Sequence, residues 1–209
     1  MAEFRLSEEQ EMLRRLAHEF SRDTIRPKSE YWEETGEFPI NEITEAHALG
    51  LTNLHIPAEY GGMGLGISDE VLVQEEFSWG DPGFSTAAYT NGLTAGPIIT
   101  GGTEEQKQEY LGRLVKSPKI ASYCVTEPAA GSDVAGIETT AVRDGDHYIL
   151  NGQKMWISGA GYADWFFVLA YTEKSAGYKG MSAFIVESAW DGVKLGKKEK
   201  NMGQRASDT

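Results

Sequence analysis

The spacing of apolar residues changes once along this chain of 209 residues, near Pro118. Before Pro118, apolar side chains such as Leu13, Leu16 and Phe20 recur at the spacing of one helix face. After Pro118 they gather in short runs rich in β-branched and aromatic residues, which is typical of strands. This single change indicates an α+β chain with a helical domain first and a β domain second.

Helix starts in the first half are marked by residues that can satisfy free backbone groups. Ser7 with Gln10 makes a capping box, in which each side chain accepts from the other residue's backbone N–H. Thr103 with Gln106 repeats the pattern and predicts another helix start. We expect Pro27 to end the first helix, because proline lacks the amide hydrogen that continues it.

The second half contains turn signals between its β-rich runs. Asp144-Gly145 and Asn151-Gly152 both tolerate positive φ and predict hairpins. Short strands at this spacing predict a small antiparallel barrel or sandwich. We place the two domains at residues 1–118 and 119–209. The expected strands are 121–125, 139–142, 147–150, 154–157, 164–171 and 182–186.

The charge and the composition exclude several classes of function. The net charge of −13 opposes non-specific binding to nucleic acid, which depends on Lys and Arg. No apolar run approaches the roughly 20 residues that span a bilayer, so we expect no membrane insertion. The single Cys124 forms no internal disulfide and fits a reducing compartment. The 4 histidines are scattered without the spacing of a metal site, so no metal is expected.

Two segments of the second half carry the pattern of a ligand site. YCVTEPAAGSDVAG at 123–136 places a strand before a turn of small residues, whose backbone N–H groups can approach an anion. NGQKMWISG at 151–159 adds Trp156 after a turn. Taken alone, such a turn is more often an ordinary loop, and such a tryptophan more often packs in a core. Together they favour a site for a flat cofactor that bears phosphate, although neither segment is a Rossmann or Walker motif.

With MSAFIVE at 181–187 and MGQRASDT at 202–209, these segments follow one another in the order found in the acyl-CoA dehydrogenases. The chain resembles the N-terminal helical and middle β domains of that family, and most closely its medium-chain branch. The resemblance implies an FAD-dependent oxidoreductase of fatty-acid β-oxidation. In such an enzyme a base removes the α-proton of an acyl-CoA, the β-hydrogen passes as hydride to flavin N5, and a trans-2,3-enoyl-CoA forms.

The resemblance also implies partners and a location. We expect an acyl-CoA as substrate and electron-transfer flavoprotein as electron acceptor. We also expect a homo-oligomer, either a dimer or a homotetramer. The expected location is the cytoplasm in a bacterium or the mitochondrial matrix in a eukaryote. Secretion is not expected, because the start MAEFRLSEEQEM lacks a basic region followed by an apolar core.

Carried over by position, the family's flavin contacts fall first on the 123–136 segment. Tyr123, Val125 and Thr126 are expected along the isoalloxazine ring, with the Thr126 hydroxyl and amide as hydrogen-bond donors. Gly131 and Ser132 are expected near the pyrophosphate, and Ser132 also near the pantetheine arm of the substrate. Donors aimed at the ring would stabilise the negative charge that reduction leaves on the flavin.

The second segment and one helix complete the expected site. Trp156, Ile157 and Ser158 are expected to cover the flavin ring near N5, with Ser158 standing where many relatives have threonine. Tyr89 and Leu93 lie at helical spacing in the region that matches the family's acyl pocket. For these two residues, substrate binding and simple packing in the helix core are equally open.

The expected catalytic base lies outside this chain. In most relatives it is a glutamate of a C-terminal helical bundle, and no part of these 209 residues matches that bundle. Glu127 is close to the motif, but its Glu-Pro context favours a role in shaping the loop. We therefore expect the chain alone to be inactive and to hold little FAD.

Two other functions stay open from the sequence. A non-catalytic relative would keep the β domain as a binding or assembly module without turnover. An acyl-CoA oxidase would differ by letting oxygen reach the reduced flavin. YCVTEP and MGQRASDT resemble the dehydrogenases more than the oxidases.

Overall fold

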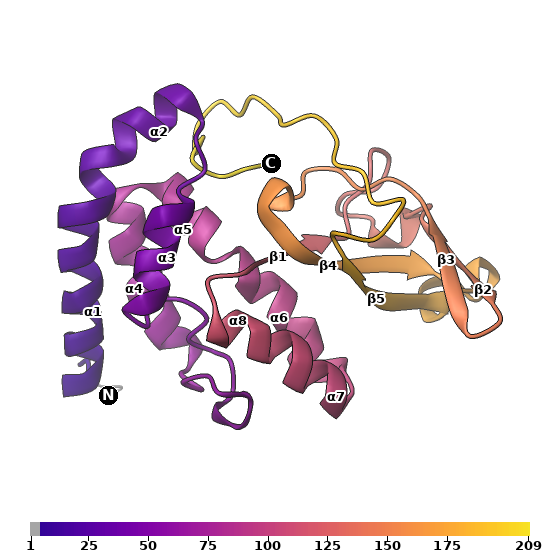
Figure 1. Ribbon diagram of the computed structural model, residues 1–209, viewed down its shortest axis with the longest axis horizontal. Coiled ribbons are helices and arrows are strands. Elements are labelled where there is room, and N and C mark those ends of the chain that lie inside the picture. The colour runs from indigo at the N-terminus through magenta and orange to yellow at the C-terminus, as the bar shows by residue number, and fades with distance from the viewer. Residues whose placement is uncertain (1–4) are drawn as a thin grey trace. The chain divides into compact units, whose positions relative to one another are not determined.

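Residues 5–209 are described by the computed structural model, whose helices and strands are shown in Figure 1. Contacts divide the described chain into two units. The first contains the residues up to Lys119 together with Glu199–Asp208, and the second contains Ile120–Lys198. We refer to them as the helical unit and the β unit. The order of a helical part followed by a β part is as the sequence predicts.

The helical unit consists of helices that follow one another with short connections. Within residues 5–209, no helix combines the length and the apolar character that a membrane crossing requires. The α-helices are α1 Glu8–Phe20, α2 Ser29–Thr35, α3 Ile40–Ala48, α4 Ile67–Gly80, α5 Pro82–Ala88, α6 Thr90–Gly101, α7 Glu104–Gln106 and α8 Gly112–Lys116. Single turns of other helix types are η1 Ser21–Ile25, η2 Arg26–Lys28, η3 Ala58–Tyr60 and η4 Lys107–Leu111.

Both capping boxes form as predicted. At the start of α1 the Gln10 amide donates to Ser7 Oγ at 3.2 Å, and the Ser7 amide donates to Gln10 Oε1 at 3.1 Å. Thr103 and Gln106 make the same reciprocal pair before α7. Each box satisfies two backbone groups that a helix start leaves free.

The expectation that Pro27 ends the first helix is wrong. The helical path continues through η1 and η2 into α2, and Pro27 occupies the first turn of η2. In a first turn the missing proline N–H breaks no helical hydrogen bond, so the chain passes without interruption. The path ends instead at Gly36, whose φ of 68° is left-handed and favours glycine.

Aromatic side chains form the centre of the helical unit. Phe84 stacks on Trp32 with ring centroids 5.7 Å apart, and it meets the edge of Phe77 at 5.2 Å. Asp81 fixes the start of α5, since it accepts from the Phe84 amide at 2.7 Å and from the Ser29 hydroxyl at 2.6 Å. Buried aromatic groups and a shared cap therefore join α2, α4 and α5.

The β unit contains one sheet built around its longest strand, β4 Ala163–Tyr171 (Figure 1). Strand β1 Ile120–Cys124 runs parallel to β4, and β5 Met181–Glu187 runs antiparallel to it. Strands β2 Thr140–Asp144 and β3 His147–Asn151 form an antiparallel hairpin. This hairpin turns at Gly145, whose φ is 59°, and joins β4 only through the parallel pair Thr140 and Tyr171.

The prediction of an antiparallel barrel or sandwich needs correction, because the sheet is mixed and open. Among the described residues, β1 and β5 flank β4, and the β2–β3 hairpin touches it at one end without closing a ring. A parallel neighbour needs a long crossover connection, and the chain between β1 and β4 supplies one.

The predicted strand at 154–157 and the hairpin at Asn151-Gly152 are also wrong. Strand β3 ends at Asn151, and the residues after it form a loop. The Met155 amide donates to the Thr126 carbonyl at 2.9 Å, so this segment is bonded to the turn after β1 and pairs in no β-ladder. The other predicted strands form within one or two residues of their expected ends.

Residues 199–208 follow the β unit in sequence but contact the helical unit. The Thr86 hydroxyl donates to Gln204 Oε1 at 3.0 Å, and the Arg205 amide donates to Glu33 Oε2 at 3.1 Å. Ala206 is buried with 1% of its surface exposed. The sequence placed this segment in the β domain, because no local pattern in it reveals a partner so far away in the chain.

Candidate functional site

The end of β1 carries the first group of predicted site residues. Tyr123 is half-buried, and its ring stacks on Phe167 of β4 at 5.1 Å with an interplanar angle of 3°. Val125 is buried, and Thr126 is half-buried just beyond the strand. The strand therefore fixes Tyr123 by packing, Val125 is buried directly after it, and Thr126 follows at the more accessible end.

A tight turn follows, and Gly131 and Ser132 are exposed beyond it. Glu127 and Ala130 exchange two backbone hydrogen bonds, of 2.9 Å and 3.1 Å, which close the turn. A Cβ added to Gly131 would meet no described atom within 4 Å. The space beside Gly131 is thus free of protein, and a ligand can approach its backbone closely.

The loop after β3 is tied to the same end of β1 by three hydrogen bonds. Lys154 Nζ donates to the Val125 carbonyl at 3.1 Å, and the Met155 amide donates to the Thr126 carbonyl at 2.9 Å. The Ser122 hydroxyl donates to the Ser158 carbonyl at 2.8 Å. The structure therefore brings the two motif segments together, as their pairing in the sequence suggests.

Trp156 has an unusual backbone between these ties. Its φ is 61°, in the left-handed region, and 54% of its surface is exposed. A non-glycine residue held in this region costs about 1–3 kcal/mol, and such strain gathers at ligand sites. Ile157 beside it is half-buried against the apolar cluster of Cys124, Ala163 and Phe166. The backbone therefore holds a large exposed aromatic residue directly after Met155, whose amide is bonded to the Thr126 carbonyl.

Two hydroxyl groups of these segments are available to a ligand. Within residues 5–209, neither the Thr126 hydroxyl nor the Ser158 hydroxyl takes part in a hydrogen bond. Both residues are half-buried and belong to the two segments that the loop ties together. A hydroxyl that is partly removed from water gains from a ligand that supplies its partner.

Glu127 is the most strongly perturbed carboxylate of the site. It is 6% exposed and accepts from Lys154 Nζ at 2.7 Å, from the Glu138 amide at 2.6 Å and from the Thr139 amide at 3.0 Å. The Thr139 hydroxyl donates to it as well. Burial raises the pKa of Glu127, but the hydrogen bonds from Lys154 and Thr139 outweigh burial and lower it to about 2.

This arrangement fits a structural carboxylate rather than a base. A general base works best with a pKa near the operating pH, and Glu127 stays ionised with its oxygens occupied. Sequence reasoning anticipated a role for Glu127 in the loop but missed Lys154 and Thr139. Lys154 lies inside the NGQKMWISG motif, whereas nothing in the local sequence marks Thr139.

Tyr89 and Leu93 lie in the helical unit and differ in exposure. Tyr89 stands between α5 and α6, where its hydroxyl donates to the Leu51 carbonyl at 3.1 Å and its ring meets the edge of Phe77 at 6.0 Å. Burial raises the pKa of Tyr89 well above its ordinary value. Leu93 is 65% exposed on α6. Tyr89 is thus fixed by packing, and Leu93 is accessible.

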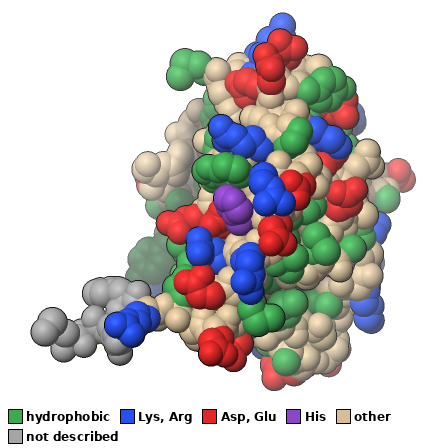
Figure 2. Space-filling view, turned by 90° about the vertical axis from the view of Figure 1, so that its left-hand side faces the viewer, with side chains coloured by type: hydrophobic (Ala, Val, Ile, Leu, Met, Phe, Trp, Pro, Cys, Tyr) green, Lys and Arg blue, Asp and Glu red, His purple; other side chains and the backbone are tan. Residues whose placement is uncertain are grey.

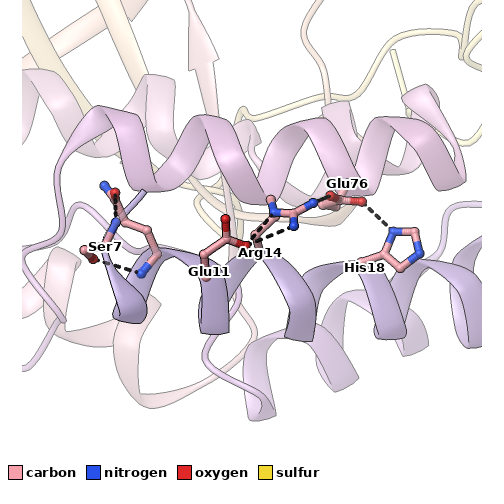
Figure 3. A network of polar contacts seen from close by, with 6 residues as sticks. Ser7, Glu11, Arg14, His18 and Glu76 are labelled. Carbon is pink, nitrogen blue, oxygen red and sulfur yellow. Dashed lines mark hydrogen bonds and ion pairs between the residues drawn. The ribbon is translucent and has the colours of Figure 1, made fainter. Parts of the chain in front are cut away.

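A second polar cluster joins α1 to α4 and is exposed (Figure 3). Glu76 of α4 accepts from Arg14 Nη1 at 3.4 Å and lies 2.7 Å from His18 Nδ1. The Arg14 and His18 side chains are 44% and 42% exposed. Figure 2 shows charges of both signs interspersed on this face. Glu76 is 14% exposed and its two partners are more exposed, so the cluster is a partly exposed link between α1 and α4.

No metal centre is found in the described chain. Among residues 5–209, no group of three or more His, Cys, Asp or Glu side chains is placed to hold a metal ion. The candidate site therefore rests on the two motif segments of the β unit.

Comparison with known families and proteins agrees with the order of the motifs. Residues 7–117 match the acyl-CoA dehydrogenase N-terminal domain, and residues 122–209 match the acyl-CoA dehydrogenase middle domain. The probable medium-chain specific acyl-CoA dehydrogenase 2, mitochondrial, of Caenorhabditis briggsae is 46% identical over 209 residues, covering 99% of this chain and 51% of that protein.

Two solved structures are similar in fold as well as in sequence. A chain in the structure of the electron transferring flavoprotein of Acidaminococcus fermentans is 38% identical, with a TM-score of 0.94 over 99% of this chain and 55% of that chain. The acyl-CoA dehydrogenase of Bacillus anthracis complexed with FAD is 37% identical, with a TM-score of 0.85 over 97% of this chain and 35% of that chain. This chain spans about half the length of the curated relatives it matches.

Proposed function

This chain belongs to the acyl-CoA dehydrogenase family, and we propose that it forms the flavin-binding part of an FAD-dependent acyl-CoA dehydrogenase. The observation that carries the proposal is the exposed Trp156, held in a left-handed backbone conformation directly after Met155, whose amide is bonded to the Thr126 carbonyl. Members of the family are flavin-dependent oxidoreductases, and one relative is seen complexed with FAD.

The residues of the β unit fit an isoalloxazine ring. Tyr123, Val125 and Thr126 would line one part of the ring, and the loop at 156–158 would cover another. The open space beside Gly131 and the exposure of Ser132 suit the pyrophosphate and the pantetheine arm. When bound, FAD supplies the acceptor for the hydride that leaves the β-carbon of an acyl-CoA.

Side chains of this chain would orient FAD and stabilise the negative charge that forms on its ring. The Thr126 and Ser158 hydroxyls would donate to the ring, where donors stabilise the negative charge that reduction produces. The Trp156 ring would shield that region from water. Glu127 would keep the turn in place, because its low pKa and the donors to both of its oxygens make it a weak base. The base is therefore proposed to lie outside residues 1–209.

The finer assignments form part of the same proposal. By the family's division, the domains are residues 1–118 and 119–209, although residues 199–208 contact the helical unit. Tyr89 and Leu93 line the acyl pocket. The substrate is an acyl-CoA, and the electron acceptor is electron-transfer flavoprotein, which is the protein named for one of the similar structures. The working protein is a dimer or tetramer in β-oxidation, in the bacterial cytoplasm or the mitochondrial matrix, where a named relative is mitochondrial.

The test compares two tryptophans of equal exposure. Trp156 is 54% exposed and Trp190 is 55% exposed, and both lie in the β unit. FAD is titrated to millimolar concentration into the wild type, Trp156→Ala and Trp190→Ala, with flavin absorbance and fluorescence as the readouts. We expect weak binding by the wild type, a clear loss in Trp156→Ala and no change in Trp190→Ala.

Equal effects of the two substitutions on FAD binding would show that Trp156 is not part of the FAD site. A wild type that leaves the flavin spectrum unchanged at the highest concentration would contradict FAD binding by this chain. Binding without acyl-CoA oxidation in a protein that also carries the rest of the family fold would indicate a non-catalytic binding module.

A further inference from the structure

The backbone at Trp156 is held from both sides. A left-handed conformation at a large side chain persists only where neighbouring contacts leave it no alternative. On the C-terminal side, Ile157 packs in the cluster of Cys124 and Phe166, and the Ser158 carbonyl accepts from Ser122. These contacts fix the segment after Trp156, and other contacts fix the segment before it.

Lys154 supplies the strongest contact on the N-terminal side. Its Nζ lies between Glu127 Oε1 at 2.7 Å and the Val125 carbonyl at 3.1 Å. The Lys154 and Glu127 side chains are only 11% and 5% exposed. Losing one partner of such a shielded pair is costly, because it leaves a buried charge uncompensated.

Glu127 is itself fixed by the backbone that leads into β2. It accepts from the Glu138 and Thr139 amides as well as from the Thr139 hydroxyl. Gly152 lies directly against the same threonine, because a Cβ at position 152 would fall 2.2 Å from Thr139 Oγ1. Glu127, Thr139 and Lys154 therefore join three segments. These are the turn after β1, the start of β2 and the loop before Trp156.

We propose that Lys154 is a positioning residue of the flavin site, which acts through Glu127 to hold Trp156 in the conformation that meets the ring. The inference rests on the proposed function, because it concerns the same FAD site. Lys154 touches neither the ring nor the substrate in this role. It sets the path of residues 152–156, and that path sets the direction of the Trp156 side chain.

The experiment separates positioning from simple stability. Lys154→Met keeps most of the length of the side chain and removes its charge, and Lys154→Arg keeps a positive charge as the conservative variant. Lys107→Met is the control for the loss of a lysine charge, because Lys107 is 18% exposed and pairs at 2.9 Å with Glu104, which is 71% exposed in the helical unit. Two readouts are taken for each variant: hydrogen exchange of individual amides without FAD, and the Kd for FAD.

We expect the Met155 amide to exchange about tenfold faster or more in Lys154→Met, because the buried Glu127 loses its partner. Amides of β4 should keep their wild-type exchange rates. The Kd for FAD should rise about tenfold or more as well. Lys154→Arg should recover most of both effects, and Lys107→Met should change neither.

The outcomes distinguish this inference from the proposed function. A folded Lys154→Met with unchanged Met155 exchange, or with wild-type affinity for FAD, overturns the positioning role. A wild type that binds no FAD contradicts the proposed function, and the exchange of Met155 then decides whether Lys154 holds the loop. If Lys154→Met does not fold, Thr139→Val takes its place, since it removes one donor to Glu127 and keeps the backbone N–H. It should shift both readouts in the same direction by a smaller factor, and no shift refutes the inference.

Discussion

Cys124 is a single residue that the fold makes unreactive although it lies beside the candidate flavin site. It is 6% exposed at the end of β1. Burial raises the pKa of its thiol to about 12, and nearby Lys154 opposes this only in part. Because the thiolate is the nucleophile, almost none of the reactive form exists at neutral pH.

We therefore predict that Cys124 resists thiol reagents in the native protein. At pH 8, Ellman's reagent should leave the folded chain unmodified over hours and should titrate one thiol within minutes in denaturant. Any modification over longer times should follow the rate of opening of the β unit. Rapid release of one equivalent of the coloured product by the folded chain would show that the thiol is accessible.

Glu127 makes stability depend on acid in a defined window. The folded state lowers its pKa from 4.5 to about 2, so the unfolded chain binds more protons between these values. The stabilising contribution of this group is thus complete above the unfolded value of 4.5 and is lost as the pH falls through about 2. Stability rises with pH across this window.

The predicted signature is a difference between two proteins. Urea unfolding of the wild type and Glu127→Gln should give free energies that differ most above pH 4.5 and converge as the pH falls toward about 2. Glu138→Gln, at an exposed neighbouring position, serves as the control. A difference that stays constant across the range would mean that Glu127 titrates alike in both states.

At the scale of an element, the loop before Trp156 depends on a close backbone approach. A Cβ at Gly152 would lie 2.2 Å from Thr139 Oγ1 and 2.6 Å from Thr139 Cβ, which forces the loop or the strand to move. We predict that Gly152→Ala destabilises the β unit by about 1–3 kcal/mol, as overpacking does.

Gly131→Ala is the matched control, since its Cβ would meet no described atom within 4 Å. Chemical denaturation of both variants provides the comparison, followed by Trp fluorescence. A neutral Gly152→Ala would mean that the loop shifts without cost, and the close contact would then have no role in stability.

Helix α1 provides the second prediction at this scale. Its capping box satisfies the Gln10 amide through Ser7 and the Ser7 amide through Gln10. Ser7→Ala removes one half of this exchange and should lower the free energy of unfolding by about 0.5–2 kcal/mol. Ser7→Asp keeps an acceptor at the cap and should retain most of the stability. Thermal unfolding followed by circular dichroism measures both, and equal melting temperatures for wild type and Ser7→Ala would contradict the prediction.

At the scale of the whole molecule, the segment 199–208 stabilises a unit from which it is far removed in sequence. A Cβ added to Gly83 would lie 2.9 Å from the Gln204 backbone, and the Arg205 amide is bonded to Glu33. Ending the chain at Lys198 should therefore destabilise the helical unit by about 1–3 kcal/mol. Hydrogen exchange should quicken in α2 and α5 and stay unchanged in β4. Faster exchange in the β unit with none in the helical unit would reverse this assignment.

The sequence alone determined the features that short stretches of chain control. The capping boxes at Ser7 and Thr103 predict their helix starts, because the groups involved lie three residues apart. The hairpin at Asp144-Gly145 forms for the same reason. The order of the motifs was also enough to identify the family, since it is preserved along the whole chain.

Only the tertiary structure decided which distant segments meet. The parallel pairing of β1 with β4, the open sheet and the attachment of residues 199–208 to the helical unit all join parts of the chain that no local pattern links. The ion pair of Lys154 and Glu127, which lie 27 positions apart in the sequence, is another contact of this kind. The left-handed backbone at Trp156 is unfavourable by itself and exists because contacts on both sides hold it. Such features depend on the free energy of the assembled fold, which a local stretch of sequence does not contain.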